Sequence, residues 1–497
     1  MRWLFAGAAA GLIAACTFHP RPIEERELAD KANLARAATR AAALPAEQPI
    51  GFNEAIARAL ARNLDIRIAD LESVIARGSV NLSDLAMLPQ LVASRAYTHR
   101  NPPGASTDKI PGDTDRTTSS LELSWSVLDF GISYVRARQA GNDALAAEER
   151  RRRLANGIVN DVRLAFWTAA LGERRQSELR AIAGDIEAAM KRSRQLAELK
   201  LQDPVVALSY QDGLLELERQ MKSYGIEIEQ ARTRLARLLN LYPGTQLRLA
   251  AGAPEDSFRN LGAMERATLE DVALVTRSEL RELDYSTRNR NLDVISAVAL
   301  GLPSFRLRAA ELYDSTTSLQ DNRWHERGWS YSFNIIGLLS ALERTRLARQ
   351  GVAMFEVRRL ALGLAVMEQV DIAREQIAVL DEDYELAKRM SAVRRTIYEI
   401  RRDRVPFDTI DELERIRAAV SAVAADIRED RAYAALQKAY GDLLASIGID
   451  QFPDGLDLNA PEAPAAIETH LASLPAAVRG LAARIEELRA ESAMGKR

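Results

Sequence analysis

Residues Ser120–Gly131 read SLELSWSVLDFG, and they decide what kind of fold the chain can adopt. Large apolar residues alternate here with polar or small ones, at Leu121, Leu123, Trp125 and Val127. This alternation is typical of a β-strand with one apolar and one polar face. From about residue 132 to residue 200 the sequence changes to a long, charged pattern at helical spacing. The sequence therefore predicts long helices together with a strand whose apolar face carries a tryptophan.

A second stretch, GWSYSFNII at residues 328–336, repeats this alternation. One interpretation is a soluble sheet whose apolar face covers a core. The other is a pair of membrane strands, because aromatic residues are typical of membrane barrels and no helical segment looks apolar enough to cover this face. In the membrane interpretation, the residues that contact lipid are Leu121, Leu123, Trp125, Trp329, Tyr331 and Phe333.

Two further extended segments follow Pro89 and Pro303, which gives four strands in one chain. Four strands cannot close a barrel, and open strand edges are not tolerated in hydrocarbon. Three chains would supply twelve strands, enough to close around an aqueous lumen. The membrane interpretation therefore predicts a homotrimer. The predicted fold is mainly α with a small transmembrane β-barrel contribution.

The second half of the chain repeats the first, and each half has a helical segment, two strands and two long helices. Pro89 and Pro303 are 214 positions apart and Gly131 and Gly337 are 206 apart, and the difference of eight falls in the loop between the strands. Loop length is the least constrained feature of such a unit. We therefore divide the chain into a signal peptide (1–15), a lead-in (16–50), two repeats (51–250 and 265–450) and a C-terminal extension (451–497).

The N-terminus, MRWLFAGAAAGLIAAC, has one arginine, an apolar run and small residues before the only cysteine of the chain. This order is typical of a secretory signal. The ending LIAAC resembles a bacterial lipobox, in which Cys16 becomes the lipidated first residue. Thr17 after it favours the outer membrane within that resemblance. The alternative is an ordinary signal peptide with an incidental cysteine.

Composition and motifs give no indication of catalysis. The net charge of −3 gives no reason to expect nucleic acid as a partner. The four histidines have no metal-ligand spacing, and the sequence has no phosphate-binding glycine loop and no G-x-S-x-G motif. We therefore expect a non-enzyme without metal or cofactor.

Several stretches resemble the TolC-type outer-membrane efflux proteins. They run in the order of that family across about residues 50–450, as EAIARALARNLDIRIAD, LPQL, LELSWSVLDFG, VRLAFW, RSELRELDY, LPSF and QKAYGDLLASIGI. The resemblance implies a trimer with a short outer-membrane barrel and a long helical tunnel through the periplasm. It also implies an exit duct for an efflux pump or a type I secretion system, with a periplasmic adaptor and an inner-membrane pump as partners.

The resemblance makes the two breaks between long helices periplasmic tips. It places the closed aperture in RVPFDTID, with Arg404 beside the turn and Asp408 and Asp411 on one face of the next helix. A ring of such carboxylates attracts cations. The alternative is that both aspartates only stabilise the first turn of a helix. The predicted adaptor-facing residues are Asp203, Pro204 and Pro406, although Asp203 suits a helix cap equally well.

The sequence departs from the family pattern in several places. Proline replaces glycine as the turn element at both tips, and the residues at 277–280 read RSEL where the family often has RPEL. The second strand also ends in NIIG, without the aspartate of LDFG. Beyond residue 461, apolar residues recur at spacings of three and four, from Leu471 to Leu488. This stripe predicts a helix that packs on the tunnel, with a separate partner-binding helix as the alternative.

A rival hypothesis for the whole chain is a periplasmic coiled-coil scaffold lipoprotein that is tethered by Cys16. The alternating aromatic strands argue against it, because a scaffold has no need of them.

Overall fold

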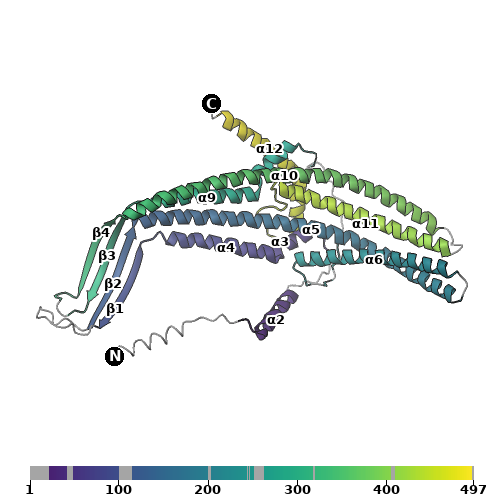
Figure 1. Ribbon diagram of the computed structural model, residues 1–497, viewed down its shortest axis with the longest axis horizontal. Helices are drawn as coiled ribbons and strands as arrows, with labels where there is room; N and C mark the ends of the chain where they lie inside the picture. Colours follow the sequence, from purple (N-terminus) through teal and green to yellow (C-terminus); the bar gives the residue numbers. More distant parts are fainter. Residues whose placement is uncertain are drawn as a thin grey trace.

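The computed structural model describes residues 22–41, 49–99, 115–199, 203–242, 244–245, 247–250, 262–316, 319–403 and 409–494, without the side chains of 409–411, 489 and 492–494. The described part is elongated (Figure 1). A sheet forms one end, and long helices run from it to the other end. This mainly helical fold with one small sheet confirms the predicted fold class.

The internal repeat is visible in the element order. The first half contains α3 (Phe52–Arg62), α4 (Leu64–Leu85), β1 (Gln90–His99), β2 (Asp115–Ser126), α5 (Val127–Glu198) and α6 (Pro204–Leu238). The second half contains α8 (Arg266–Thr276), α9 (Ser278–Ala299), β3 (Ser304–Asp314), β4 (Arg323–Ser332), α10 (Ile335–Arg402) and α11 (Thr409–Ser446). Among the described helices, α2 (Glu25–Ala41) and α12 (Ala463–Met494) lie outside the repeats.

The helical segment that opens each repeat is broken, whereas the sequence predicted a continuous helical pattern. Asn63 ends α3 and caps α4, because its side chain accepts hydrogen bonds from the backbone N–H groups of Asp65 and Ile66. Arg277 separates α8 from α9, also in an extended conformation, at ψ 123°. Asn63 and Arg277 are 214 positions apart, like the two prolines before the strands.

Both strand-to-helix junctions lie earlier than the sequence predicted, which was about residue 132 for the first long helix and about residue 338 for the second. Ser126 caps α5 by accepting a hydrogen bond from the Asp129 backbone N–H, and Asn334 caps α10 in the same way with Gly337. Val127 is therefore the first residue of α5 and not a strand residue. Phe333 lies just beyond the end of β4, since that strand stops at Ser332.

The four strands form one antiparallel sheet in the order β1-β2-β3-β4. Leu123 of β2 stands opposite Leu91 of β1 and Ala309 of β3, and Leu307 of β3 stands opposite Trp329 of β4. Because β1 and β4 are the outer strands, each leaves one row of backbone groups unpaired within the described sheet.

The main hydrophobic core lies in the middle of the chain, where α3, α5, α8, α10, α11 and α12 meet. The rings of Phe52, Phe166 and Trp167 pack there with centroids 5.5–5.7 Å apart. From α12, the buried residues Leu471 and Val478 join this core, and the helix packs on α3 and α8. Leu488, at the end of the predicted stripe, is exposed.

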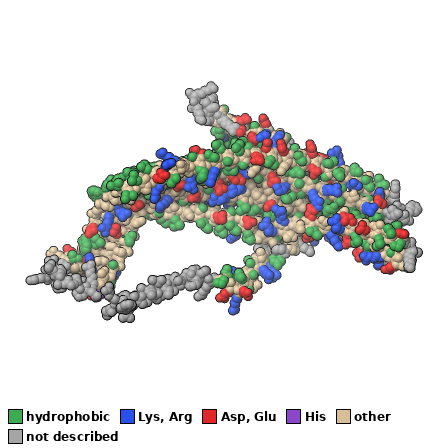
Figure 2. All heavy atoms as spheres, in the orientation of Figure 1, with side chains coloured by type: hydrophobic (Ala, Val, Ile, Leu, Met, Phe, Trp, Pro, Cys, Tyr) green, Lys and Arg blue, Asp and Glu red, His purple; other side chains and the backbone are tan. Residues whose placement is uncertain are grey.

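The long helices carry charged side chains along their whole length (Figure 2). At about 1.5 Å per residue, the 72 residues of α5 span roughly 110 Å. A second hydrophobic cluster holds α5, α6 and α11 together toward the end far from the sheet. Among the described residues, no helix combines the length and the apolarity that a membrane crossing requires.

Candidate functional site

One face of the sheet carries an apolar band, most of which is open to solvent in the single chain. In the observed register, Leu121, Leu123 and Trp125 share this face with apolar residues of the other three strands, namely Leu91, Ala93, Phe305, Leu307, Ala309, Trp329 and Tyr331. Two charged residues lie on the same face, since Glu311 stands opposite Leu121 and Arg327 stands opposite Ala309. Trp329 is 70% exposed, and Tyr331, Leu121 and Leu123 are exposed as well. The apolar band therefore lacks a covering layer within the described chain.

Aromatic packing fixes the ends of this apolar band. The rings of Phe305 and Trp329 stack across neighbouring strands with centroids 5.8 Å apart. Trp125 is half-buried because Phe130, in the first turn of α5, packs edge-on against it at 5.6 Å. Such pairs add about 0.5–1.5 kcal/mol beyond area burial.

The opposite face of the sheet is polar. Arg308 of β3 lies between two carboxylates, at 3.0 Å from Glu122 of β2 and 3.7 Å from Glu326 of β4. The hydroxyls of Ser94 and Ser120 hydrogen bond at 2.7 Å on the same face. Charges that pair across strands suit a surface that faces water. The sheet thus separates an apolar side from a hydrated side.

The tip between α5 and α6 ends in a capped helix. The Asp203 carboxylate accepts hydrogen bonds from the backbone N–H groups of Val205 (2.8 Å) and Val206 (3.2 Å). Pro204 is the first residue of α6, where a missing N–H costs nothing. The capping role that the sequence left open for Asp203 is therefore present.

The tip between α10 and α11 contains the predicted aperture. Arg404, Pro406 and Asp408 lie outside the described residues, and so does the side chain of Asp411, whose backbone belongs to α11. Cys16 also lies outside them. The arrangement of the predicted aperture residues therefore stays a prediction.

Next to this segment, the first turns of α11 are tied to neighbouring helices by ion pairs that the sequence analysis missed. Glu414 contacts Arg401 of α10 at 2.7 Å and Arg417 at 3.0 Å, and these two hydrogen bonds lower the pKa of its carboxyl. Glu412 forms an ion pair with Arg192 of α5. Acidic and basic residues are too common on these helices for the sequence to have indicated which ones pair.

Glu412 also binds a buried tyrosine of α6. The Tyr210 hydroxyl lies 3.4 Å from the Glu412 carboxylate. Burial and this neighbouring carboxylate raise the pKa of Tyr210 to about 12, so the phenol stays protonated and donates the hydrogen bond. The start of α11 is thus connected to α5, α6 and α10.

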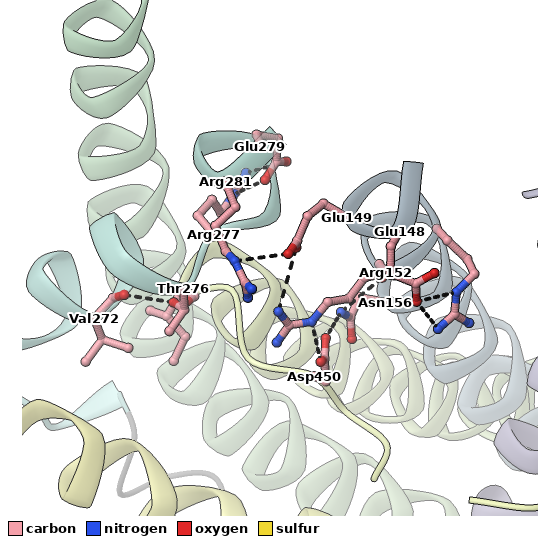
Figure 3. A network of polar contacts seen from close by, with 12 residues as sticks. Glu148, Glu149, Arg152, Asn156, Val272, Thr276, Arg277, Glu279, Arg281 and Asp450 are labelled. Atoms are coloured by element: carbon pink, nitrogen blue, oxygen red, sulfur yellow. Dashed lines mark hydrogen bonds and ion pairs between the residues drawn. The ribbon is translucent and has the colours of Figure 1, made fainter. Parts of the chain in front are cut away.

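A polar network near the main core joins the two repeats (Figure 3). The Glu149 carboxylate lies between Arg281 (3.0 Å) and Arg152 (3.8 Å), and burial raises its pKa despite both cations. Arg152 also forms an ion pair with Asp450, which follows α11. The Arg277 guanidinium donates to the carbonyls of the last turn of α11, at 3.0–3.1 Å. A cation at a helix C-terminus is favourable, so this network holds α5, α9 and α11 in one arrangement.

The helix α10 has an exposed apolar stripe along its whole length. Its members recur at helical spacing and face away from the buried residues Val366, Val370 and Ile377; they are Ile336, Leu339, Leu347, Met354, Val357, Ile372, Val379, Leu386, Met390, Val393, Ile397 and Ile400. Similar stripes are exposed on α4 (Leu64, Ile68, Leu71, Ile75, Leu82 and Leu85) and on α6 (Val205, Leu208, Leu215 and Ile226). In Figure 1, α10 runs along one edge of the molecule, and α4 and α6 run along the other.

Comparisons with known proteins place the fold. No protein-family model matches the chain, and no curated protein matches its sequence. Solved structures do match, among them the CmeC outer-membrane channel of Campylobacter jejuni, with a TM-score of 0.66 at 14% identity over 83% of this chain and 89% of that one. The open-state MtrE outer-membrane channel of Neisseria gonorrhoeae matches with a TM-score of 0.62 at 17% identity, over 80% of this chain and 89% of that one. CusC matches with a TM-score of 0.62 at 18% identity, over 80% of this chain and 92% of that one. The chain therefore has the fold of the TolC-like outer-membrane channels.

Proposed function

We propose that three copies of this chain form a passive exit duct through the outer membrane and the periplasm. The duct would serve a tripartite efflux pump or a type I secretion system, with a periplasmic adaptor and an inner-membrane pump as partners. The observation that carries this proposal is the uncovered apolar face of the sheet. Such a face is unfavourable in water and favourable against lipid.

The two edges of the chain support an assembly of identical copies. One edge presents β4 and the α10 stripe, and the other presents β1 with the stripes of α4 and α6. If the β4 edge of one copy joins the β1 edge of the next, β4 pairs with β1. The α10 stripe is then covered by α4 near the sheet and by α6 toward the far end of the molecule. Contacts between unlike surfaces close into a ring when the rotation allows it.

The number of copies follows from the strands. Every backbone group in the hydrocarbon must be paired, so the sheet edges have to close on one another. Three copies of a four-stranded sheet give twelve strands, which leave a lumen wide enough for water. The polar face with Arg308, Glu122 and Glu326 would then line the lumen.

The predicted site residues have the following roles in this duct. Asp408 and Asp411 of each copy surround the periplasmic aperture with Arg404 as a compensating cation, and Asp203, Pro204 and Pro406 mark the adaptor-facing tips. Cys16 carries a lipid anchor in the outer membrane. Incorporation of labelled palmitate that Cys16→Ala does not abolish would contradict the anchor.

The test of the duct is assembly of the full chain in membranes. We expect the protein to resist carbonate extraction and to run as an SDS-resistant trimer that conducts ions in a planar bilayer. Leu386→Asp, in the α10 stripe, is expected to reduce the trimer fraction at least several-fold, because it places a charge in the joint between copies. Leu34→Asp is the matched control, since Leu34 of α2 is exposed and lies outside the three stripes.

The outcomes separate the parts of the proposal. A wild-type chain that carbonate extracts as a monomer would contradict the duct and favour the scaffold hypothesis. A trimer that Leu386→Asp and Leu34→Asp leave equally intact would contradict only the pairing of α10 with α6.

A further inference from the structure

A groove lies where the second repeat passes from helix to sheet. It has a volume of about 670 Å³ and lies between the end of α9 and the beginning of α10. Small-molecule sites in proteins have volumes of about 300–1,000 Å³. Its walls include Val298, Leu302, Leu338, Leu342, Arg346 and Arg349. We refer to it as the junction groove.

The groove is apolar near the sheet and basic farther from it. Leu302 and Leu342 are 56% and 65% exposed, so apolar surface is open to solvent in the part of the groove near the sheet. Arg346 follows Leu338 by eight residues, which is about 12 Å along α10 in the direction away from the sheet. Hydrophobic side chains gather over this end of α10 in Figure 2. This order of apolar and basic surface is that of a lipid whose acyl chain points toward the membrane.

The floor of the groove is made of small and internally satisfied residues. A Cβ atom on Gly301 would come within 2.9 Å of the Ala341 Cβ, so the end of α9 approaches α10 closely. Because Gly301 has no side chain and Ala341 has only a methyl group, neither residue fills the groove. The Thr345 hydroxyl donates to the Ala341 carbonyl at 2.8 Å. The Thr345 hydroxyl therefore has its hydrogen bond within the helix, and Gln350 is a further polar residue of the lining.

Both arginines are available to an anion. The Arg346 side chain is 71% exposed, and its ion-pair partner within the described residues is Glu343, at 3.7 Å on the same helix. Arg349 is exposed and forms no ion pair with any carboxylate of the described residues. Guanidinium groups bind phosphate oxygens in a planar, two-pronged geometry.

The groove lies beside the stripe of α10 and borders it at one arginine. At about 100° per residue, Leu338, Leu342 and Arg349 lie within about 40° of one another, and the stripe residues Ile336 and Leu347 lie a third to half a turn away. Arg346 lies closer to the stripe, about 20° from Leu339. A neighbour packed on the stripe would therefore border the groove at Arg346 and leave the side with Leu338 and Arg349 open.

We propose that the junction groove binds an anionic phospholipid of the membrane leaflet next to the long helices. The acyl chain lies over Leu338 and Leu342, and the phosphate lies between Arg346 and Arg349. This inference rests on the proposed function, since it requires the sheet to lie in a membrane. The bound lipid would fix the depth of each copy in the bilayer, because basic residues at the interface anchor a membrane protein.

The test uses native mass spectrometry of the purified full chain in detergent, titrated with dioleoyl phosphatidylglycerol. We expect one retained lipid per copy, and an apparent Kd at least about tenfold weaker in Arg346→Gln/Arg349→Gln, since each basic residue near a lipid surface contributes measurably. Thr345→Trp, which fills the groove, is expected to weaken binding without removing a charge.

The control variant is Arg344→Gln/Arg394→Gln, which removes two exposed charges from the same helix outside the groove. It is expected to change the apparent Kd less than twofold. Equal weakening in both double variants would overturn the proposal in favour of bulk charge attraction. Full displacement of the lipid by millimolar inorganic phosphate would reduce the site to a phosphate site without an acyl groove.

Two further outcomes keep this inference apart from the duct itself. Loss of the trimer in Arg346→Gln/Arg349→Gln or in Thr345→Trp would assign the groove to a neighbouring copy and overturn the lipid site. A stable, carbonate-resistant trimer that shows no preference for phosphatidylglycerol over phosphatidylethanolamine would overturn the lipid site and leave the duct in place.

Discussion

The middle of the chain and the sheet at its end contain the same kind of aromatic pair in opposite surroundings. In the middle, Phe52 and Phe166 pack at 5.5 Å and both are buried. In the sheet, Phe305 and Trp329 stack at 5.8 Å, yet Trp329 is 70% exposed. The difference is a second layer, because helices cover the first pair and no described element covers the second.

Polar groups show the same contrast. Arg163, which is fully buried in the middle, lies over the Phe52 ring and donates to Gln437 and Gln451. The outer strands of the sheet instead leave backbone donors and acceptors without a partner in the described chain. The core in the middle is covered within a single chain, whereas the apolar band of the sheet has no cover in the described chain. The following predictions test this contrast, beginning with the largest effect.

The largest effect is expected at Gly448, where α11 ends in the middle of the chain. Its φ is +72°, and a Cβ atom there would lie 2.7 Å from the Arg277 backbone nitrogen. Gly448→Val should therefore cost about 2–6 kcal/mol from backbone strain and overpacking together. The measurement is denaturant unfolding in detergent, followed by helical circular dichroism.

Gly455→Val is the matched control for this prediction. Gly455 has a φ of +71° but open space around its Cβ position, so only the strain of about 1–3 kcal/mol applies. Equal losses in the two variants would mean that the close approach to Arg277 contributes nothing to the middle of the chain.

An intermediate effect is expected in the sheet. Trp329→Arg should reduce insertion into vesicles by about 2–4 kcal/mol, the cost of a basic residue on the lipid face of a barrel at mid-membrane. Trp329→Leu, the control, should insert almost normally. Helical circular dichroism should be the same in both, because Trp329 lies in β4 and makes no part of the helical core. Normal insertion of Trp329→Arg would place this face away from lipid.

The smallest effect is expected at the aperture. Asp408→Asn/Asp411→Asn should lower the preference of the channel for cations, because a ring of carboxylates attracts them. The measurement is the reversal potential in a salt gradient across a planar bilayer. The control is Glu343→Gln/Glu399→Gln, which removes two carboxylates of α10 outside this segment. Identical reversal potentials in the two variants would leave both aspartates with a capping role only.

Much of the fold could be predicted because periodicity is a local signal. The change from alternation to helical spacing near Ser126 placed β2 and α5 within a few residues, and the repeated prolines placed the second half. The junctions themselves were wrong by three to five residues. Ser126 and Asn334 cap α5 and α10 with side-chain hydrogen bonds, so each helix begins directly after its cap. The helix begins there even though the apolar alternation of the strand continues for a few more residues.

Other features could not be predicted because they depend on contacts between distant segments. The break at Arg277 lies within an unbroken helical pattern, and its guanidinium binds carbonyls of α11 almost 170 residues away. The partners of Glu412 and Glu414 at the tip were equally invisible, since nearly every turn of these helices offers a charge of each sign. The helix α2 was also missed, because its sequence resembled a polar lead-in.

The sequence by itself determined the duplication, the types of element in each half and the two-faced character of the strands. These properties depend on residue spacing, which is local and survives in any arrangement of the chain. Only the tertiary structure decided which apolar residues are covered, because burial depends on the neighbours that the fold supplies. For that reason the stripe of α10 and the junction groove emerged only in three dimensions, whereas the uncovered face of the sheet had been predicted from the alternation of its strands.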